Sequence, residues 1–159
     1  FSRMKLTANF TLDELTKSQT AERKGINNNP SPKQIENLKA LAVNILQPIR
    51  SHYNEPLQIS SGFRCAELCI AIGSKITSQH VADENAAAAD FEIWGRDNKE
   101  VATYIRDNLE FDQLILEFYK EGEPNSGWIH CSYSSNKNRN QCLYASREDG
   151  KTKYTPWLA

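Results

Sequence analysis

Three ionisable residues in the second half of the chain have the types and positions needed for metal-assisted hydrolysis. Asp90, Glu117 and His130 each lie in the middle of a segment that alternates in polarity as a β-strand does. In each segment the ionisable group falls on the face away from the bulkiest apolar side chains. Because a charged group inside a strand is costly unless it is paired or bound to a metal, we expect the three to share a site on one sheet face.

A second imidazole comes from His80, in a loop just before the segment that holds Asp90. Two histidines and a carboxylate form the ligand set of a hydrolytic zinc site, which keeps a fourth position open for water. Zinc lowers the pKa of that water to about 7 and polarises the carbonyl of the bond to be cut. Glu117 is the best-placed general base, taking the proton of the water and passing it to the leaving amine.

Helices are expected to dominate the first half of the chain. Thr11 with Glu14, and Ser31 with Gln34, are the pairs of capping boxes that begin helices. The second of these helices has apolar residues at helical spacing over 35–49 and is the most amphipathic in the chain. Pro48 is expected to kink or end it.

Strands are expected to dominate the second half, which favours an α+β fold with an antiparallel sheet and helices packed on one side. Two more short helices are predicted, at 66–72 and after a capping pair formed by Asp97 and Glu100. The predicted strands are 57–60, 87–93, 112–118, 127–133 and 141–145.

The 159 residues fit a single domain, for which we predict the bounds 4–150. Residues 1–3 precede the chain's only methionine, Met4, and are interpreted as a remnant outside the natural protein. Residues 151–159 are predicted to be a polar, loosely held tail. Nineteen basic and 20 acidic residues give a net charge of −1, so nothing indicates a nucleic-acid partner. No apolar run is long enough for membrane insertion.

The four cysteines are too few for a disulfide-stapled scaffold, and they lack the paired spacing of structural zinc sites. We expect reduced, mostly buried thiols, with a bridge across a hairpin between Cys131 and Cys142 left open. A thiol-based metal or redox protein that uses all four is a distant alternative. The cysteines are Cys65, Cys69, Cys131 and Cys142.

Seven short segments between residues 10 and 130 also carry a likeness to a known family. They are FTLDEL (10–15), ISSGFR (59–64), GSK (73–75), SQH (78–80), ADFE (89–92), FDQLILE (111–117) and GWIH (127–130). In this order the chain resembles the zinc D-Ala-D-Ala carboxypeptidases and L,D-endopeptidases of peptidoglycan, which share a hedgehog-like fold. It is most similar to their short phage and prophage forms, over residues 10–145. Each segment is weak alone, but their order and number are specific.

The resemblance assigns roles to the same residues and adds others. It implies that His80, Asp90 and His130 bind Zn²⁺ and that Glu117 is the catalytic base. It also implies that Arg64 binds substrate or stabilises the developing oxyanion, as a planar cation can.

The resemblance further implies a substrate groove beside the metal. Ser78 and Gln79, just before the first histidine, would line this groove, and Trp128 would form part of its wall.

The sequence departs from the family pattern at three places near these residues, one of which is that Cys65 and Cys69 replace residues that are usually polar or small beside the arginine. Nine residues separate His80 from Asp90, where the family has six with a central glycine. A loop absorbs about three extra residues if the strand register is kept; alternatively Asp83 or Glu84 intrudes on the metal. Many relatives also carry the catalytic carboxylate at the position of Ser126, so the base must come from elsewhere.

These observations predict a zinc peptidase that hydrolyses amide bonds in peptidoglycan stem peptides, as a phage or prophage lysis enzyme. The alternative is a non-catalytic peptidoglycan-binding or virion structural module that has kept the fold. The N-terminus lacks the layout of a secretory signal. We therefore expect the protein to stay in the host cytoplasm until release and then to act on the cell wall. We also expect it to be a monomer.

Overall fold

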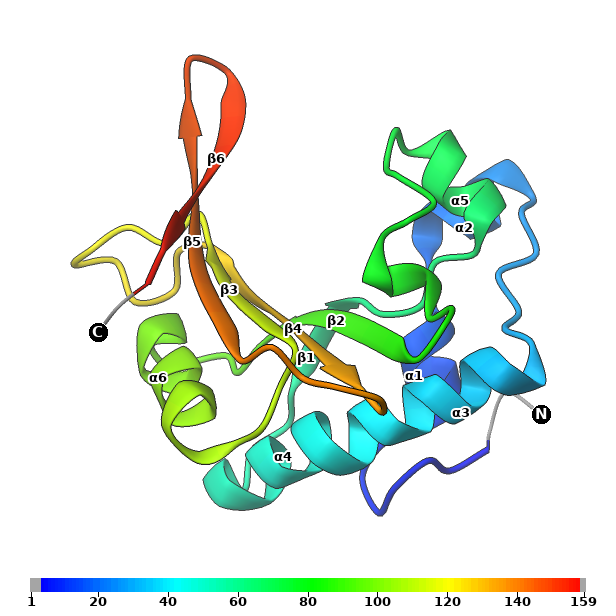
Figure 1. Cartoon of the computed structure of the whole chain (residues 1–159), viewed down its shortest axis with the longest axis horizontal. Coiled ribbons are helices and arrows are strands. Elements are labelled where there is room, and N and C mark those ends of the chain that lie inside the picture. Colours follow the sequence, from blue (N-terminus) through cyan, green and yellow to red (C-terminus); the bar gives the residue numbers. More distant parts are fainter. Residues whose placement is uncertain (1–3, 158–159) are drawn as a thin grey trace.

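The computed structural model describes residues 4–157 and has an α+β architecture with one six-stranded sheet (Figure 1). The strands lie in the order β1-β2-β4-β3-β5-β6. The predicted fold class is confirmed, although β3 and β5 pair in parallel while the other neighbours are antiparallel. The strands are β1 (Gln58–Ser61), β2 (Ala86–Glu92), β3 (Gln113–Glu117), β4 (Trp128–Ser134), β5 (Gln141–Glu148) and β6 (Lys151–Pro156).

The parallel pair follows from the path of the chain after β4. Residues 135–140 pass the start of β3 and cross to its other edge, where Asn140 and Gln141 donate backbone hydrogen bonds to the carbonyls of Phe111 and Asp112. Strand β5 therefore begins beside the first residue of β3 and runs in the same direction.

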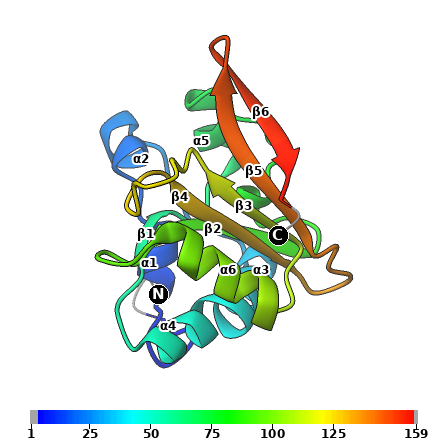
Figure 2. The same cartoon turned by 90° about the vertical axis from the view of Figure 1, so that its left-hand side faces the viewer.

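The longer helices α3, α4 and α6 lie along one side of the sheet (Figures 1 and 2). The capping boxes predicted at Thr11 and Ser31 are both present and begin α1 and α3. Asp97 begins α6 by accepting the Lys99 N–H, without the reciprocal bond predicted from Glu100. The helices are α1 (Leu12–Thr16), α2 (Gln19–Lys24), α3 (Pro32–Leu41), α4 (Gln47–Tyr53), α5 (Ala66–Ala71) and α6 (Asn98–Asn108).

Pro48 does not end its helix, because the backbone widens just before it. Between α3 and α4 the segment Ala42–Leu46 is π-helical, and the Gln47 N–H bonds to the Ala42 carbonyl five residues back. A wider turn makes room for the proline ring, which has no N–H to donate. The helical path from 32 to 53 is thus continuous. Of the two predicted effects of Pro48, a kink or an end, the end is wrong.

The core lies between the helices and one face of the sheet. Phe91 on β2, Leu114 and Leu116 on β3, and Ile129 on β4 are all fully buried there. Successive residues of a strand point to opposite faces. The sheet face that is turned away from these helices therefore receives the residues that alternate with them, which are Asp90, Ile115, Glu117, Trp128 and His130.

The predicted loose tail is an ordered strand instead. Residues 151–156 form β6, which pairs with β5 over six residue pairs, and Trp157 behind it is only 4% exposed. Trp157 lies against Tyr144, and this contact ties the end of the hairpin to the sheet. The predictions for residues 1–3 and for the last two residues lie outside the described part. None of the described helices is long and apolar enough to cross a membrane.

Gly127 occupies the turn that leads into β4, at a position where a side chain would not fit. Its φ is +65°, and a Cβ there would overlap the Glu117 carbonyl oxygen and the backbone of Phe118. We expect Gly127→Ala to lower the free energy of unfolding by about 2–4 kcal/mol, through left-handed strain and steric overlap together. Urea unfolding measures the loss.

The control for this variant is Gly122→Ala. Gly122 has a φ of +84° and no atom within 4 Å of the added Cβ, so it reports strain alone, about 1–2 kcal/mol. Equal losses in the two variants would contradict the close approach of Gly127 to β3.

Candidate metal centre

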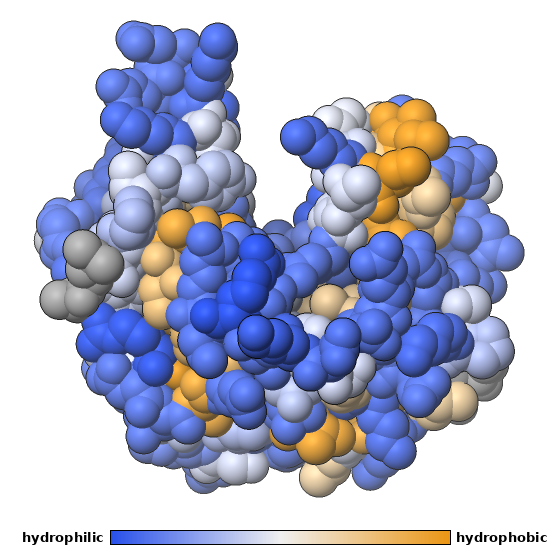
Figure 3. All heavy atoms as spheres, in the orientation of Figure 1, coloured by the Kyte–Doolittle hydropathy of each residue, from blue (hydrophilic) through white to orange (hydrophobic). Residues whose placement is uncertain are grey.

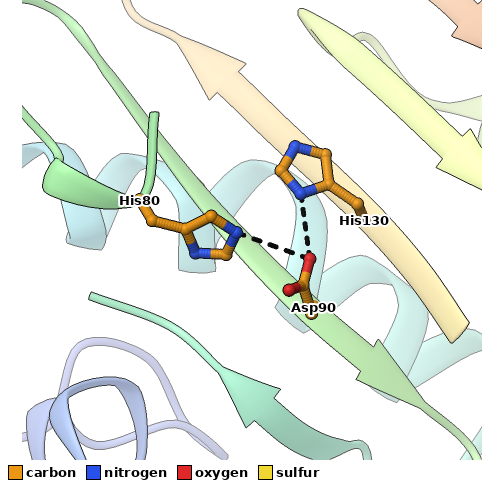
Figure 4. Close-up of side chains that lie close together, drawn as sticks. All are labelled: His80, Asp90 and His130. Carbon is orange, nitrogen blue, oxygen red and sulfur yellow. Dashed lines mark hydrogen bonds and ion pairs between the residues drawn. The ribbon is translucent and has the colours of Figure 1, made fainter. Parts of the chain in front are cut away.

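Three side chains from separate elements converge on the open face of the sheet. His80 lies in the short 3₁₀ turn Gln79–Val81, Asp90 on β2, and His130 opposite Asp90 on β4. Asp90 Oδ1 is 3.4 Å from His80 Nε2 and 2.9 Å from His130 Nδ1, and one ligand atom from each residue lies within 4.8 Å of the others. Figure 4 shows both rings turned toward the carboxylate.

The hydrogen bond on the far side of His80 fixes which nitrogen faces the site. His80 Nδ1 lies 2.7 Å from the Gly62 carbonyl oxygen, and a carbonyl can only accept, so Nδ1 carries the proton. Burial is the main cause that lowers the pKa of His80, so the ring is neutral. Its Nε2 lone pair then points at Asp90. Metal-binding histidines are commonly held in this way by a carbonyl on the second nitrogen.

Asp90 is anionic although it is buried. Burial works to raise the pKa of Asp90, but it is outweighed, chiefly by the hydrogen bond with His130, and the pKa is held well below its usual range. A carboxylate and the lone pair of a neutral imidazole repel one another at close range. A divalent cation between them turns this repulsion into coordination, which is the physical reason to assign a metal here.

The spacing of the ligand atoms fits zinc. Tetrahedral coordination with bonds of about 2.1 Å places ligand atoms roughly 3.4 Å apart. The observed 3.4 and 2.9 Å need only small shifts to reach this geometry. Two imidazoles and one carboxylate are also the donor set of zinc sites that leave a position open for water.

The lengthened loop between the first two ligands is held away from the metal centre. Val81 and Ala82 present their carbonyls to the side chains of Gln34 and Asn37 on α3, and Gln34 also binds the Asp83 carboxylate. Asp83 is therefore directed toward α3. Glu84 lines the cavity but is not part of the ligand group found in residues 4–157.

Glu117 lies beside the metal centre on the neighbouring strand. It pairs across the sheet with Trp128, whose Nε1–H donates a 2.8 Å hydrogen bond to Glu117 Oε2. Burial, followed by the charge of Asp90, raises the pKa of Glu117, which brings a carboxylate closer to the range of a working base. Ser126, the position used by many relatives, instead bonds within its own turn to Lys120 and Glu123.

A cavity of about 830 Å³ opens over these residues. Figure 3 shows it as a deep notch between the projecting β5–β6 hairpin and the part of the surface that carries α5. Its lining includes the three residues expected in the groove, which are Ser78, Gln79 and Trp128, together with Arg64.

The backbone of Arg64 is held by a hydrogen bond, whereas its guanidinium group makes none among the described residues. Its backbone N–H donates to the His80 carbonyl at 2.9 Å, while Nη2 is 3.8 Å from Asp90 Oδ2, too long for a hydrogen bond. Its buried Nε has no partner among the described residues. The guanidinium therefore retains donors for a substrate carboxylate or oxyanion.

The cysteines do not form a competing site. All four are free thiols, and none belongs to the ligand group found among residues 4–157. Cys131 and Cys142 flank Leu114 from the two strands beside it, so β3 lies between them. Their backbones are roughly 10 Å apart, too far for a disulfide, and the bridge left open by the sequence is excluded.

Asp112 holds the loop that carries His80, and it was not among the site residues predicted from the sequence. Its carboxylate accepts 3.0 and 2.8 Å hydrogen bonds from Arg139 Nε and Nη2, and a 2.6 Å bond from Gln79 Nε2. Gln79 precedes His80, so this buried carboxylate fixes the loop to the start of β3. The Phe-Asp-Gln segment marked the position, but nothing in the sequence identified the partners.

We expect Asp112→Ala to lower the free energy of unfolding by about 2–3 kcal/mol, since four N–H donors, including the backbone N–H of Arg139, lose a buried acceptor. Hydrogen bonds from Arg139 are the main cause that lowers the pKa of Asp112. Stability from a lowered pKa is complete above the unfolded value, about 3.9, and is lost as pH falls through the folded value. The difference from wild type in urea unfolding should therefore shrink in acid. Asp107→Ala, which breaks an exposed pair with Arg106, should cause no measurable change.

The fold and the site together define a metallopeptidase: a His-Asp-His centre on a sheet face, an open cavity above it, and a carboxylate beside it. The model of the Peptidase M15 family matches residues 8–132, and the chain belongs to this family. M15 peptidases are zinc enzymes, in agreement with the metal that the ligand geometry favours. No curated protein matched the sequence.

Proposed function

We propose that the chain is a zinc-dependent peptidase that hydrolyses amide bonds in the stem peptides of peptidoglycan. The observation that carries the proposal is the meeting of His80, Asp90, His130 and Glu117 in one open cavity. A binding module has no need for a buried ligand set beside a carboxylate of raised pKa. The lengthened loop would favour such a module if it separated the first two ligands, but His80 Nε2 and Asp90 Oδ1 are 3.4 Å apart.

In the proposed reaction, bound zinc supplies Lewis acidity and lowers the pKa of a water molecule to about 7. Glu117 accepts the proton of the attacking water and delivers it to the nitrogen of the leaving amine. Trp128 orients Glu117 through the 2.8 Å hydrogen bond to Oε2, which leaves Oε1 for the water. Arg64 directs its free guanidinium donors to the substrate.

The charge of a second hollow beside the cavity supports a substrate with carboxylates. This second hollow of about 850 Å³ shares Arg64 with the first. Its wall adds Lys17 and Arg23 against one acidic residue, Glu14. Stem peptides carry free carboxylates, and the excess of positive charge in this second hollow favours them.

The biological setting is part of the same proposal. The resemblance to phage and prophage enzymes supports a role in lysis of the cell wall. We propose that the protein acts as a monomer, is held in the host cytoplasm until release, and binds neither nucleic acid nor membrane. The balanced charge of −1 supports the last point.

Digestion of purified peptidoglycan tests the proposal. We expect the zinc-loaded protein to release fragments whose masses show cleavage of an amide bond in the stem peptide, and we expect a chelator to stop the release until zinc is added back. The masses also tell removal of a terminal D-alanine from cleavage within the peptide. Binding to peptidoglycan without cleavage, by a protein with zinc bound, would favour the non-catalytic module.

A further inference from the structure

The C-terminal hairpin contributes a tyrosine to the cavity above the metal centre. Tyr154 lies on β6 and lines the same cavity as Glu117, Asp90 and His130. It comes from beyond the matched segment 8–132. Its hydroxyl makes no hydrogen bond among the described residues.

Strand register shows that Tyr154 and Glu117 are on the same face. Tyr154 is directly opposite Ala145 on β5, and Ala145 is directly opposite Glu117 on β3. Residues paired in this way point to the same side of a sheet. The two backbones are therefore separated by two strand spacings, roughly 10 Å, a gap that a tyrosine and a glutamate side chain span together.

The residue between them on β5 is the small Ala145, so no large side chain separates Tyr154 from Glu117 along this row. Ala145 faces the cavity yet is only 3% exposed, so neighbouring side chains close over its methyl group. Tyr154 itself is 54% exposed. Burial is the main cause that raises the pKa of Tyr154, and the charges of Glu117 and Asp90 add to it. The phenol is thus within electrostatic reach of both carboxylates and keeps its proton at neutral pH.

We propose that the Tyr154 hydroxyl donates a hydrogen bond to the carbonyl oxygen of the scissile amide as that oxygen becomes negative. Water adds to the carbonyl carbon, the carbonyl π electrons move to the oxygen, and the C–N bond then breaks with the proton going to the leaving nitrogen. Tyr154 transfers no proton in this sequence. The inference rests on the proposed peptidase function and makes β5–β6 a wall of the catalytic site.

The test is Tyr154→Phe, which removes one oxygen atom and keeps the ring. We expect kcat on a stem-peptide substrate to fall by at least about tenfold with KM within about twofold, because loss of one oxyanion donor costs roughly 10²–10³ in kcat where it has been measured. A phosphinate analogue of the cleaved dipeptide, which mimics the tetrahedral state, should bind the zinc-loaded variant at least about tenfold more weakly by calorimetry.

Tyr144→Phe is the matched control. Tyr144 is the neighbour of Ala145 on β5, pairs with Leu116 of the core face, and contacts Trp157 on the side away from the cavity. It should leave kcat, KM and phosphinate affinity unchanged. Equal losses in both variants would make the effect one of hairpin stability, and a Tyr154→Phe protein with wild-type kcat and phosphinate affinity would overturn the proposal.

Failure of this inference is distinguishable from failure of the proposed function. If the wild type cleaves stem peptides and Tyr154→Phe does so equally well, only the role of Tyr154 falls. If the wild type cleaves none, the peptidase proposal falls and the catalytic role of Tyr154 falls with it. Unchanged zinc content in Tyr154→Phe shows that any loss does not come from the metal site.

Discussion

Replacing His80 by alanine is expected to abolish peptidase activity and to remove the stabilisation that zinc gives the fold. His80 is 3% exposed and offers Nε2 to the metal while Gly62 holds its other nitrogen. A metal that binds only the folded state stabilises it by about 4 kcal/mol at 1,000 times its dissociation constant. In thermal unfolding, added zinc should raise the midpoint of the wild type and leave that of His80→Ala unchanged. Asp90→Ala and His130→Ala should behave in the same way.

His52 supplies the matched control, since it is the third histidine of the chain. It is stacked on Tyr104 at a ring distance of 3.9 Å and takes no part in the ligand group. His52→Ala should keep its zinc and its turnover. A His80→Ala protein that still binds one zinc per chain and is stabilised by it would place the metal elsewhere.

Glu117→Gln is expected to keep zinc and lose most of its turnover. Glutamine has nearly the same shape and can still accept the hydrogen bond from Trp128, but it cannot take a proton from water. General acid–base catalysis contributes roughly 10²–10⁴ in rate, and we expect kcat to fall by about that factor. Steady-state kinetics on a stem peptide, with zinc content measured on the same sample, separates this loss from loss of the metal.

The outcomes for Glu117 are clear-cut. Loss of zinc in Glu117→Gln would make this residue a ligand, and unchanged kcat would remove it from the reaction. Glu100→Gln is the control, because Glu100 lies on α6 and forms an exposed pair with Arg96. It should leave both zinc content and kcat as they are.

Much of the site was predictable because strands alternate with a period of two. The alternation placed Asp90, Glu117 and His130 on the face away from the core, and the structure has them there. His80 followed from its position just before a strand. Alternation does not predict the order of the strands in the sheet. That order places Trp128 on β4 opposite Glu117 on β3.

Long-range pairing accounts for the errors. Cys131 and Cys142 would face one another across a hairpin only if β5 lay next to β4 in the sheet. Strand β3 lies between these two strands instead. The polar composition of 151–156 is that of a solvated edge, and one strand partner on β5 was enough to order it. As a result Tyr154, at the far end of the sequence, was not recognised as part of the cavity.

The most direct measurement is a crystal structure of the zinc-soaked protein, with diffraction recorded on both sides of the zinc absorption edge. We predict one anomalous peak, about 2.1 Å from His80 Nε2, His130 Nδ1 and a carboxylate oxygen of Asp90. A fully soaked crystal with no peak among these three atoms, or with its zinc on the cysteines, would contradict the assignment of a metallopeptidase centre to this sheet face.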